Sequence, residues 1–156
     1  MFLFKILYDF FGVLMVANVS GMSKNIVLDH FIEDEHGVCA GKHVIIDCYD
    51  AEHLSCQKTM HQAFLDMIEA CGATLLHIHL HVFGASGGIS GVAVLAESHI
   101  SVHTWPENHY AAFDVFMCGN AKPHQAVDVI QAHFKPKSIQ VNEIRRGALV
   151  ENQEES

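Results

Sequence analysis

Apolar and polar residues alternate along several segments of the 156-residue chain with the two-residue period of a β-strand. The clearest of these is residues 73–83, in which apolar side chains alternate with three histidines, His77, His79 and His81. Successive strand side chains point to opposite faces, so this segment has one apolar face and one imidazole face. Further strands are predicted at residues 43–49, 92–104, 111–117 and 137–144.

Two other segments repeat apolar residues with the helical period. Residues 54–71 place Met60 and Phe64 on one face, and Gly72 stands where helices are commonly capped. Residues 123–134 have the same character. The resulting order, β–α–β–β–β–α–β, predicts an α+β fold: a two-layer α/β sandwich with a mainly antiparallel sheet and both helices on one face.

The chain length suits one folded domain. We expect this domain at residues 43–147, after a partly disordered N-terminal extension at 1–42 and before a flexible acidic tail at 148–156. Residues 1–17 are apolar, but charged residues interrupt them and the run is too short to span a membrane. A signal peptide, another kind of leader, and translation from Met22 all remain open.

The net charge of −9 argues against nucleic-acid binding, because nothing here would neutralise a phosphate backbone. Five cysteines without a CxxC pair predict free thiols and a cytoplasmic location. Thirteen histidines raise the question of a metal site. The three strand histidines, however, are spaced roughly 6–7 Å apart, too far for one tetrahedral ion, so no metal is predicted.

The most informative stretch is AESHISVHTWPE at residues 96–107, followed by YAAFDVFMCG at 110–119. The hydroxyl of Ser98 can attack the carbonyl of the preceding residue, Glu97, and convert the amide to an ester. A base can then remove the serine α-proton, and β-elimination breaks the chain. The expected products are residues 1–97 and residues 98–156, the second beginning with a pyruvoyl group.

These motifs resemble the S-adenosylmethionine decarboxylase family in its short prokaryotic, pyruvoyl-dependent form, over residues 43–147. The resemblance implies that Ser98 becomes the pyruvoyl cofactor, which forms a Schiff base with the substrate amine. It assigns His103 as the processing base, for which imidazole has a suitable pKa, and Cys118 as the proton donor. It also implies a dimer of processed heterodimers with active sites near the dimer interface.

The resemblance further implies that S-adenosylmethionine is converted to the aminopropyl donor for spermidine synthesis. Glu107 matches the carboxylate that binds the ribose hydroxyls, and Phe83 lies close to the aromatic that stacks on adenine. Val82 departs from the pattern because a basic residue is usual there, and the glycine-rich loop after Phe83 is one residue longer. This departure leaves a pyruvoyl-dependent decarboxylase of ornithine or arginine as the alternative.

A third hypothesis is a non-enzymatic binding module or metal carrier, which would require an unprocessed chain. The sequence does not decide whether a diamine activates the enzyme.

Overall fold

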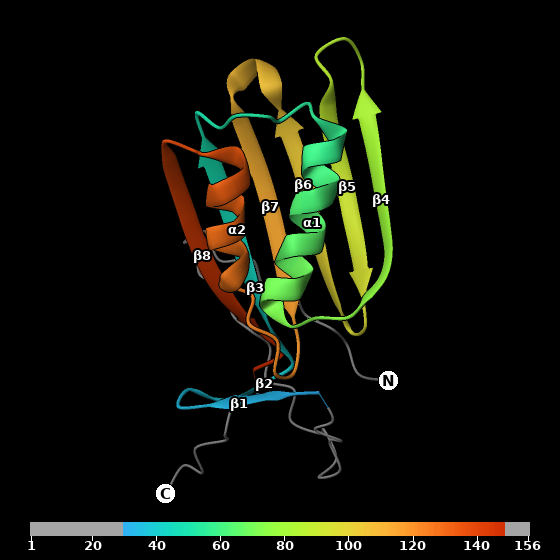
Figure 1. Cartoon of the computed structure of the whole chain (residues 1–156). Helices are drawn as coiled ribbons and strands as arrows, with labels where there is room; N and C mark the ends of the chain where they lie inside the picture. The colour runs from blue at the N-terminus through green and yellow to red at the C-terminus, as the bar shows by residue number, and fades with distance from the viewer. Residues whose placement is uncertain (1–29, 149–156) are drawn as a thin grey trace, which may run out of the picture.

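The computed structural model describes residues 30–148. They form a six-stranded antiparallel sheet with two α-helices on one of its faces, and a separate two-stranded hairpin (Figure 1). The elements in chain order are β1 (Ile32–Asp34), β2 (Gly37–Cys39), β3 (Gly41–Tyr49), α1 (Gln57–Cys71), β4 (Leu75–Phe83), β5 (Gly88–Leu95), β6 (Ser98–Trp105), the 3₁₀ turn η1 (Pro106–Asn108), β7 (Tyr110–Met117), α2 (Gln125–Phe134) and β8 (Ser138–Arg146). The predicted α+β class is confirmed.

The core lies between the helices and the sheet, whose strand order is β4-β5-β6-β7-β3-β8. Alternate residues of each central strand point to the helices, because the strand period is two. The apolar stripes of both helices meet them there. The largest buried side chains of this core include Ile46, Phe64, Met67, Ile100, Phe113, Ile130 and Phe134.

The helix predicted at residues 54–71 begins three residues later, at Gln57. His53 adopts a left-handed φ of 61°, and a turn joins the N–H of Cys56 to the carbonyl of His53. The helix ends where the sequence predicted, because Gly72 has a φ of 71° and its N–H caps the carbonyl of Glu69.

The strand predicted at residues 92–104 is wrong as a single strand. β5 ends at Leu95, β6 begins at Ser98, and these two residues pair across a two-residue turn. The turn contains neither glycine nor asparagine, the residues that usually mark such a hairpin, so no residue in it predicts a turn. As a consequence, Ser98 lies at one end of the sheet, at the first residue of a strand.

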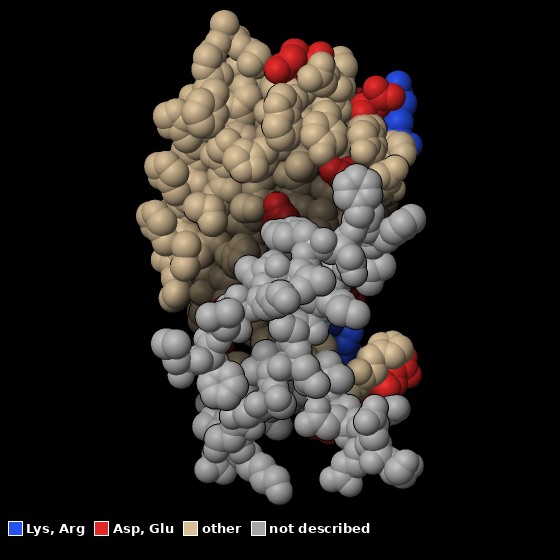
Figure 2. Space-filling model, turned by 180° about the vertical axis from the view of Figure 1, so that it is seen from behind, with Lys and Arg blue, Asp and Glu red and all other residues tan. Residues whose placement is uncertain are grey.

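The face of the sheet opposite the helices is not covered by any helix within residues 30–148, and we call it the open face (Figure 1). It carries the outward-pointing side chains of all six strands, β4, β5, β6, β7, β3 and β8. Seen from behind, the part of this side that is not hidden by grey atoms shows few charged residues (Figure 2). Apolar side chains that remain exposed on it are Tyr49, Phe83, Val94, Trp105 and Ile144.

The hairpin β1–β2 is fastened to the edge of the sheet by ion pairs. Asp34 lies 2.5 Å from the guanidinium of Arg145 in β8 and 3.0 Å from the ammonium of Lys42 in β3. The side chain of Lys42, the backbone N–H of His36 and the side chain of Arg145 hold the pKa of Asp34 well below its usual range. Arg145 also donates to the carbonyl of Gly37, so the hairpin has a defined position next to the sheet.

Candidate active site

The turn between β5 and β6 and the turn after β7 meet at the lower end of the sheet in Figure 1. We call this region the lower end. A cavity of about 240 Å³ opens there. Its lining includes His30, Thr74, Glu97, Ser98, Cys118 and Gly119.

Ser98 and Cys118 are neighbours at the lower end, although twenty positions separate them in the sequence. The Oγ atom of Ser98 accepts a hydrogen bond of 3.2 Å from the backbone N–H of Cys118. The register of β6 against β7, which pairs His99 with Phe116, produces this contact. A backbone N–H aimed at Oγ orients the hydroxyl and would stabilise negative charge that develops on it.

The thiol of Cys118 is suited to donating a proton. Burial raises the pKa of Cys118, and the nearby carboxylate of Glu97 and thiol of Cys39 raise it further. The thiol therefore stays protonated at neutral pH, as a general acid must. Cys48 and Cys71 also have raised pKa values, about 12 and about 11, but both are buried core residues outside the cavity.

Glu97 occupies an unusual backbone conformation, with a φ of 66°. For a residue with a side chain this left-handed region is unfavourable by about 1–2 kcal/mol. The peptide bond that would be cleaved follows Glu97 directly. Cleavage of that bond would relieve the constraint on the Glu97 backbone, so strain at this position would favour it.

His30 is a residue of this site that the sequence did not reveal. Its Nδ1 atom lies 2.9 Å from a carboxylate oxygen of Glu97, and its carbonyl accepts a hydrogen bond of 2.8 Å from the N–H of Gly119. No motif marks His30, and it lies in the predicted extension. Only the tertiary structure brings it to the turn between β5 and β6, residues 96 and 97, which we call the cleavage turn.

The other predicted residues lie at the opposite, upper end of the sheet. Phe83 ends β4, Glu107 lies in η1 after β6, and His103 lies near the end of β6 on the open face. His103 forms a hydrogen bond of 2.7 Å between its Nδ1 atom and the Oγ atom of Ser90 on β5. Ser90 was not predicted; the cross-strand pairing of Ser90 with His103 would have identified it.

Within one chain, the structure does not bring His103 to Ser98. The two residues are five positions apart on one strand, which is roughly 16 Å at the extended rise. An odd separation also places their side chains on opposite faces. The expectation that a base lies within hydrogen-bond reach of Ser98 is therefore not met by His103 of the same chain.

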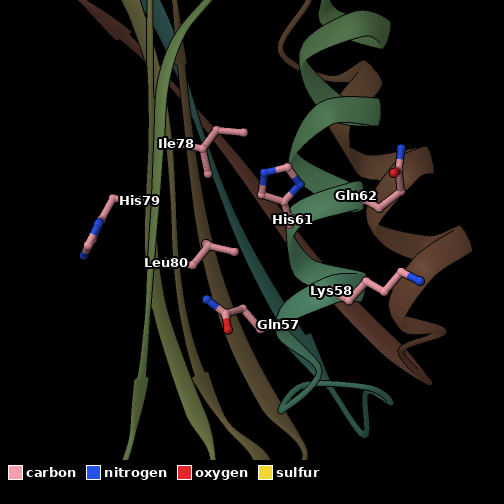
Figure 3. Close-up of a pocket in the computed structure, with 7 residues that line it drawn as sticks. All are labelled: Gln57, Lys58, His61, Gln62, Ile78, His79 and Leu80. Atoms are coloured by element: carbon pink, nitrogen blue, oxygen red, sulfur yellow. The ribbon is translucent and has the colours of Figure 1, made fainter.

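A larger cavity, of about 620 Å³, lies beside neither end but between α1 and the edge strand β4 (Figure 3). Gln57 and His61 point toward the strand there, whereas His79 points to the other face of β4. Lys58, Gln62, Ile78 and Leu80 complete its lining. None of the predicted site residues lines it, and it holds no nucleophile paired with a base.

Within residues 30–148, no three His, Cys, Asp or Glu side chains gather in a way that could hold a metal ion. In the same part of the chain, no helix is long and apolar enough to cross a membrane.

Comparison with known proteins gives a consistent result. The family model described as S-adenosylmethionine decarboxylase matches residues 42–147. An S-adenosylmethionine decarboxylase proenzyme of Methanococcus maripaludis is 46% identical over 112 residues, covering 70% of this chain and 91% of that protein. One from Thermomicrobium roseum is 37% identical over 112 residues, covering 71% and 97%.

Among solved structures, the adenosylmethionine decarboxylase from Aquifex aeolicus superposes with a TM-score of 0.62 at 29% identity. The match covers 76% of this chain and 98% of that one. His30 lies before the segment that the family model matches.

Proposed function

The chain belongs to the S-adenosylmethionine decarboxylase family, whose members are pyruvoyl-dependent lyases, and we propose that its pyruvoyl group forms from Ser98. One observation carries this proposal: the hydroxyl of Ser98 is hydrogen-bonded to the residue that bears a protonated thiol. The family's reaction is the decarboxylation of S-adenosylmethionine, and nothing in the comparisons favours the ornithine or arginine alternative. The product is the aminopropyl donor for spermidine synthesis.

Formation of the group requires a balanced sequence of steps. The Oγ atom of Ser98 bonds to the carbonyl carbon of Glu97, and the bond from that carbon to the Ser98 nitrogen breaks to give an ester and an amine. A base removes the Ser98 α-proton, and the Cβ–Oγ bond breaks, releasing Glu97 as a carboxylate. The remaining dehydroalanine tautomerises to an imine, which water hydrolyses to a ketone with loss of ammonia.

Once formed, the pyruvoyl group would supply an electron-withdrawing ketone for condensation with the substrate amine. Loss of carbon dioxide leaves the α-carbon of the substrate in need of a proton. We assign this proton to Cys118, because its raised pKa keeps the thiol in the donating form. Phe83 and Glu107 are assigned to the adenine and the ribose of the substrate.

The separation of His103 from Ser98 supports a dimer in which each site is completed by the partner. We infer that two copies pack with their open faces together, about a two-fold axis that lies between the sheets and perpendicular to the strands. This arrangement brings the upper end of one sheet against the lower end of the other. The partner's His103, Phe83 and Glu107 would then approach the lower end, where Ser98 is the first residue of its strand.

The open face has the properties that such an interface needs. No helix within residues 30–148 covers it, and it exposes large apolar side chains, among them Phe83, Trp105 and Ile144. Burial of exposed apolar surface of this kind stabilises an interface between two subunits. The five cysteines are all free, which supports the proposal that the protein works in the reducing cytoplasm.

Mass measurement of the denatured protein tests the identity of the cofactor residue. We expect two fragments that divide between Glu97 and Ser98, the second carrying a pyruvoyl terminus. Ser98→Ala should give one intact chain of unchanged fold. A single intact wild-type chain would contradict the proposal, and so would cleavage at another bond.

Co-expression of two differently tagged variants tests the source of the base. Ser98→Ala cannot cleave itself but retains His103, whereas His103→Ala retains Ser98 and lacks its own imidazole. If the base acts between subunits, the His103→Ala chain is cleaved only when Ser98→Ala is present. Cleavage of His103→Ala expressed alone, or its failure in the mixture although mixed dimers are isolated, would refute the inferred arrangement.

A further inference from the structure

His30 contacts the cleavage turn from outside the family-matched segment, which begins at residue 42. Its imidazole lies 2.9 Å from the carboxylate of Glu97, the residue whose carbonyl carbon is attacked. Both side chains are about half exposed, so the contact lies at the mouth of the cavity and not in the core. The position of this contact raises the question of what it contributes to cleavage.

The contacts around the scissile bond form a closed ring. The turn after β7 donates twice: the N–H of Cys118 to Ser98 Oγ, and the N–H of Gly119 to the carbonyl of His30. His30 then returns to the cleavage turn through the Glu97 side chain. Both residues that flank the scissile bond are therefore fixed to the same short turn.

The chain that delivers His30 is itself fastened to the sheet. The β1–β2 hairpin begins two residues after His30, at Ile32, and is bound through Asp34 to Arg145 and Lys42. His30 also has a left-handed φ of 64°, and its carbonyl is held by the N–H of Gly119 in the turn after β7. The imidazole therefore has a defined place before any substrate arrives.

We propose that His30 is a positioning residue for self-cleavage. It holds the Glu97 side chain and so keeps the turn in the conformation that presents the Glu97 carbonyl to Ser98 Oγ. The inference rests on the proposed function of Ser98. Attack within a chain depends on alignment, because small misplacements of the reacting atoms lower the rate strongly. His30 acts through Glu97 and takes no part in the bond changes.

Two substitutions of His30 distinguish the contribution of the imidazole from that of the backbone conformation. Glycine and asparagine both tolerate the left-handed conformation of His30, but only asparagine retains a side-chain donor near the position of Nδ1. In pulse-labelled cell-free translation, followed on denaturing gels, we expect His30→Gly to slow cleavage about threefold to fivefold. His30→Asn should restore the rate to near that of the wild type.

A matched control and a coupling test make the result specific. His36→Gly makes the same change in the same arm, but the His36 side chain does not contact the cleavage turn, so its rate should equal that of the wild type. The double variant Glu97→Gln/His30→Gly is compared with the single variant Glu97→Gln. In this background we expect His30→Gly to slow cleavage less than it does in the wild type, because the carboxylate that contacts His30 is already absent. Thermal unfolding of each uncleavable Ser98→Ala counterpart checks that the fold is kept.

The outcomes distinguish this inference from the proposed function. If the wild type cleaves at Ser98 and His30→Gly cleaves equally fast, the role of His30 is refuted while that of Ser98 stands. If His30→Asn is as slow as His30→Gly, the side-chain contact is not the cause and the inference also fails. If the wild type does not cleave, the proposed function itself fails.

Discussion

The two ends of the sheet differ in how their functional residues are held. At the lower end, Ser98, Cys118 and Glu97 are tied to one another and to His30 by contacts within the chain. At the upper end, His103, Phe83 and Glu107 are exposed and the described contacts leave them open to a ligand or partner. Bond making within a chain requires atoms fixed in advance, whereas residues that act on a substrate or on a second subunit need to be accessible until it arrives.

The strongest test of this comparison separates cleavage from turnover at the lower end. Cys118→Ala keeps the backbone N–H that contacts Ser98, so it should still be cleaved. Turnover should fall about 10²- to 10⁴-fold, because the proton donor is missing. Fragment analysis on denaturing gels and carbon dioxide release measure the two effects. Full turnover would exclude Cys118 as the donor, and loss of cleavage would show that the thiol acts earlier.

A substitution at the upper end should affect binding without affecting cleavage. Glu107→Gln removes the charge that we assign to the ribose hydroxyls, and one hydrogen bond to a charged group corresponds to about a 10- to 100-fold rise in KM. Steady-state kinetics with S-adenosylmethionine measure it. The neighbouring Asn108→Ala is a control in the same 3₁₀ turn. Unchanged KM would remove Glu107 from the substrate site.

Loss of the hydrogen bond between Ser90 and His103 should have a smaller effect, and only on the rate of cleavage. Ser90→Ala removes the hydroxyl that orients the imidazole, so cleavage should slow about fivefold to tenfold, the range for one hydrogen bond. Time courses of cleavage measure it, with turnover of the mature fraction as the internal reference. Ser90→Thr keeps the hydroxyl and should restore most of the rate. Equal rates for Ser90→Ala and the wild type would show that His103 does not need this partner.

The smallest predicted effect is a difference in the pH at which two thiols become reactive. Cys118 has a raised pKa because of burial and the Glu97 charge, whereas Cys56, near the upper end, has a lowered pKa because Thr59 hydrogen-bonds its sulfur. Alkylation needs the thiolate, which forms as pH rises through the pKa. Iodoacetamide labelling of the uncleavable Ser98→Ala protein, read by mass spectrometry, should therefore modify Cys56 at lower pH than Cys118. The reverse order would contradict the assigned environments.

The same reasoning fixes the sign of a pH effect on turnover. A proton donor works in its protonated form, so activity that depends on Cys118 is lost as pH rises through its pKa. Because that pKa is raised, the loss should fall above the range of an ordinary thiol.

Prediction from the sequence succeeded where information is local. The alternation in residues 73–83 and the apolar stripe around Met60 and Phe64 gave a strand and a helix that the structure contains. It failed at residues 92–104, because the tight turn contains neither glycine nor asparagine to mark it. The buried positions change there from odd (Ala93, Leu95) to even (Ile100, Val102), but no turn residue signals the change. The start of α1 was predicted too early because the turn at His53 is set by contacts outside the helix.

The sequence by itself determined the fold class and predicted the chemistry of Ser98, since periodicity and a serine next to a peptide carbonyl are properties of neighbouring residues. Only the tertiary structure decided which of the predicted residues meet. Strand register placed Ser98 against Cys118 and Ser90 against His103, and the docking of the N-terminal hairpin placed His30 on Glu97. Contacts between distant segments depend on pairing and packing of the whole chain, and no short motif encodes them.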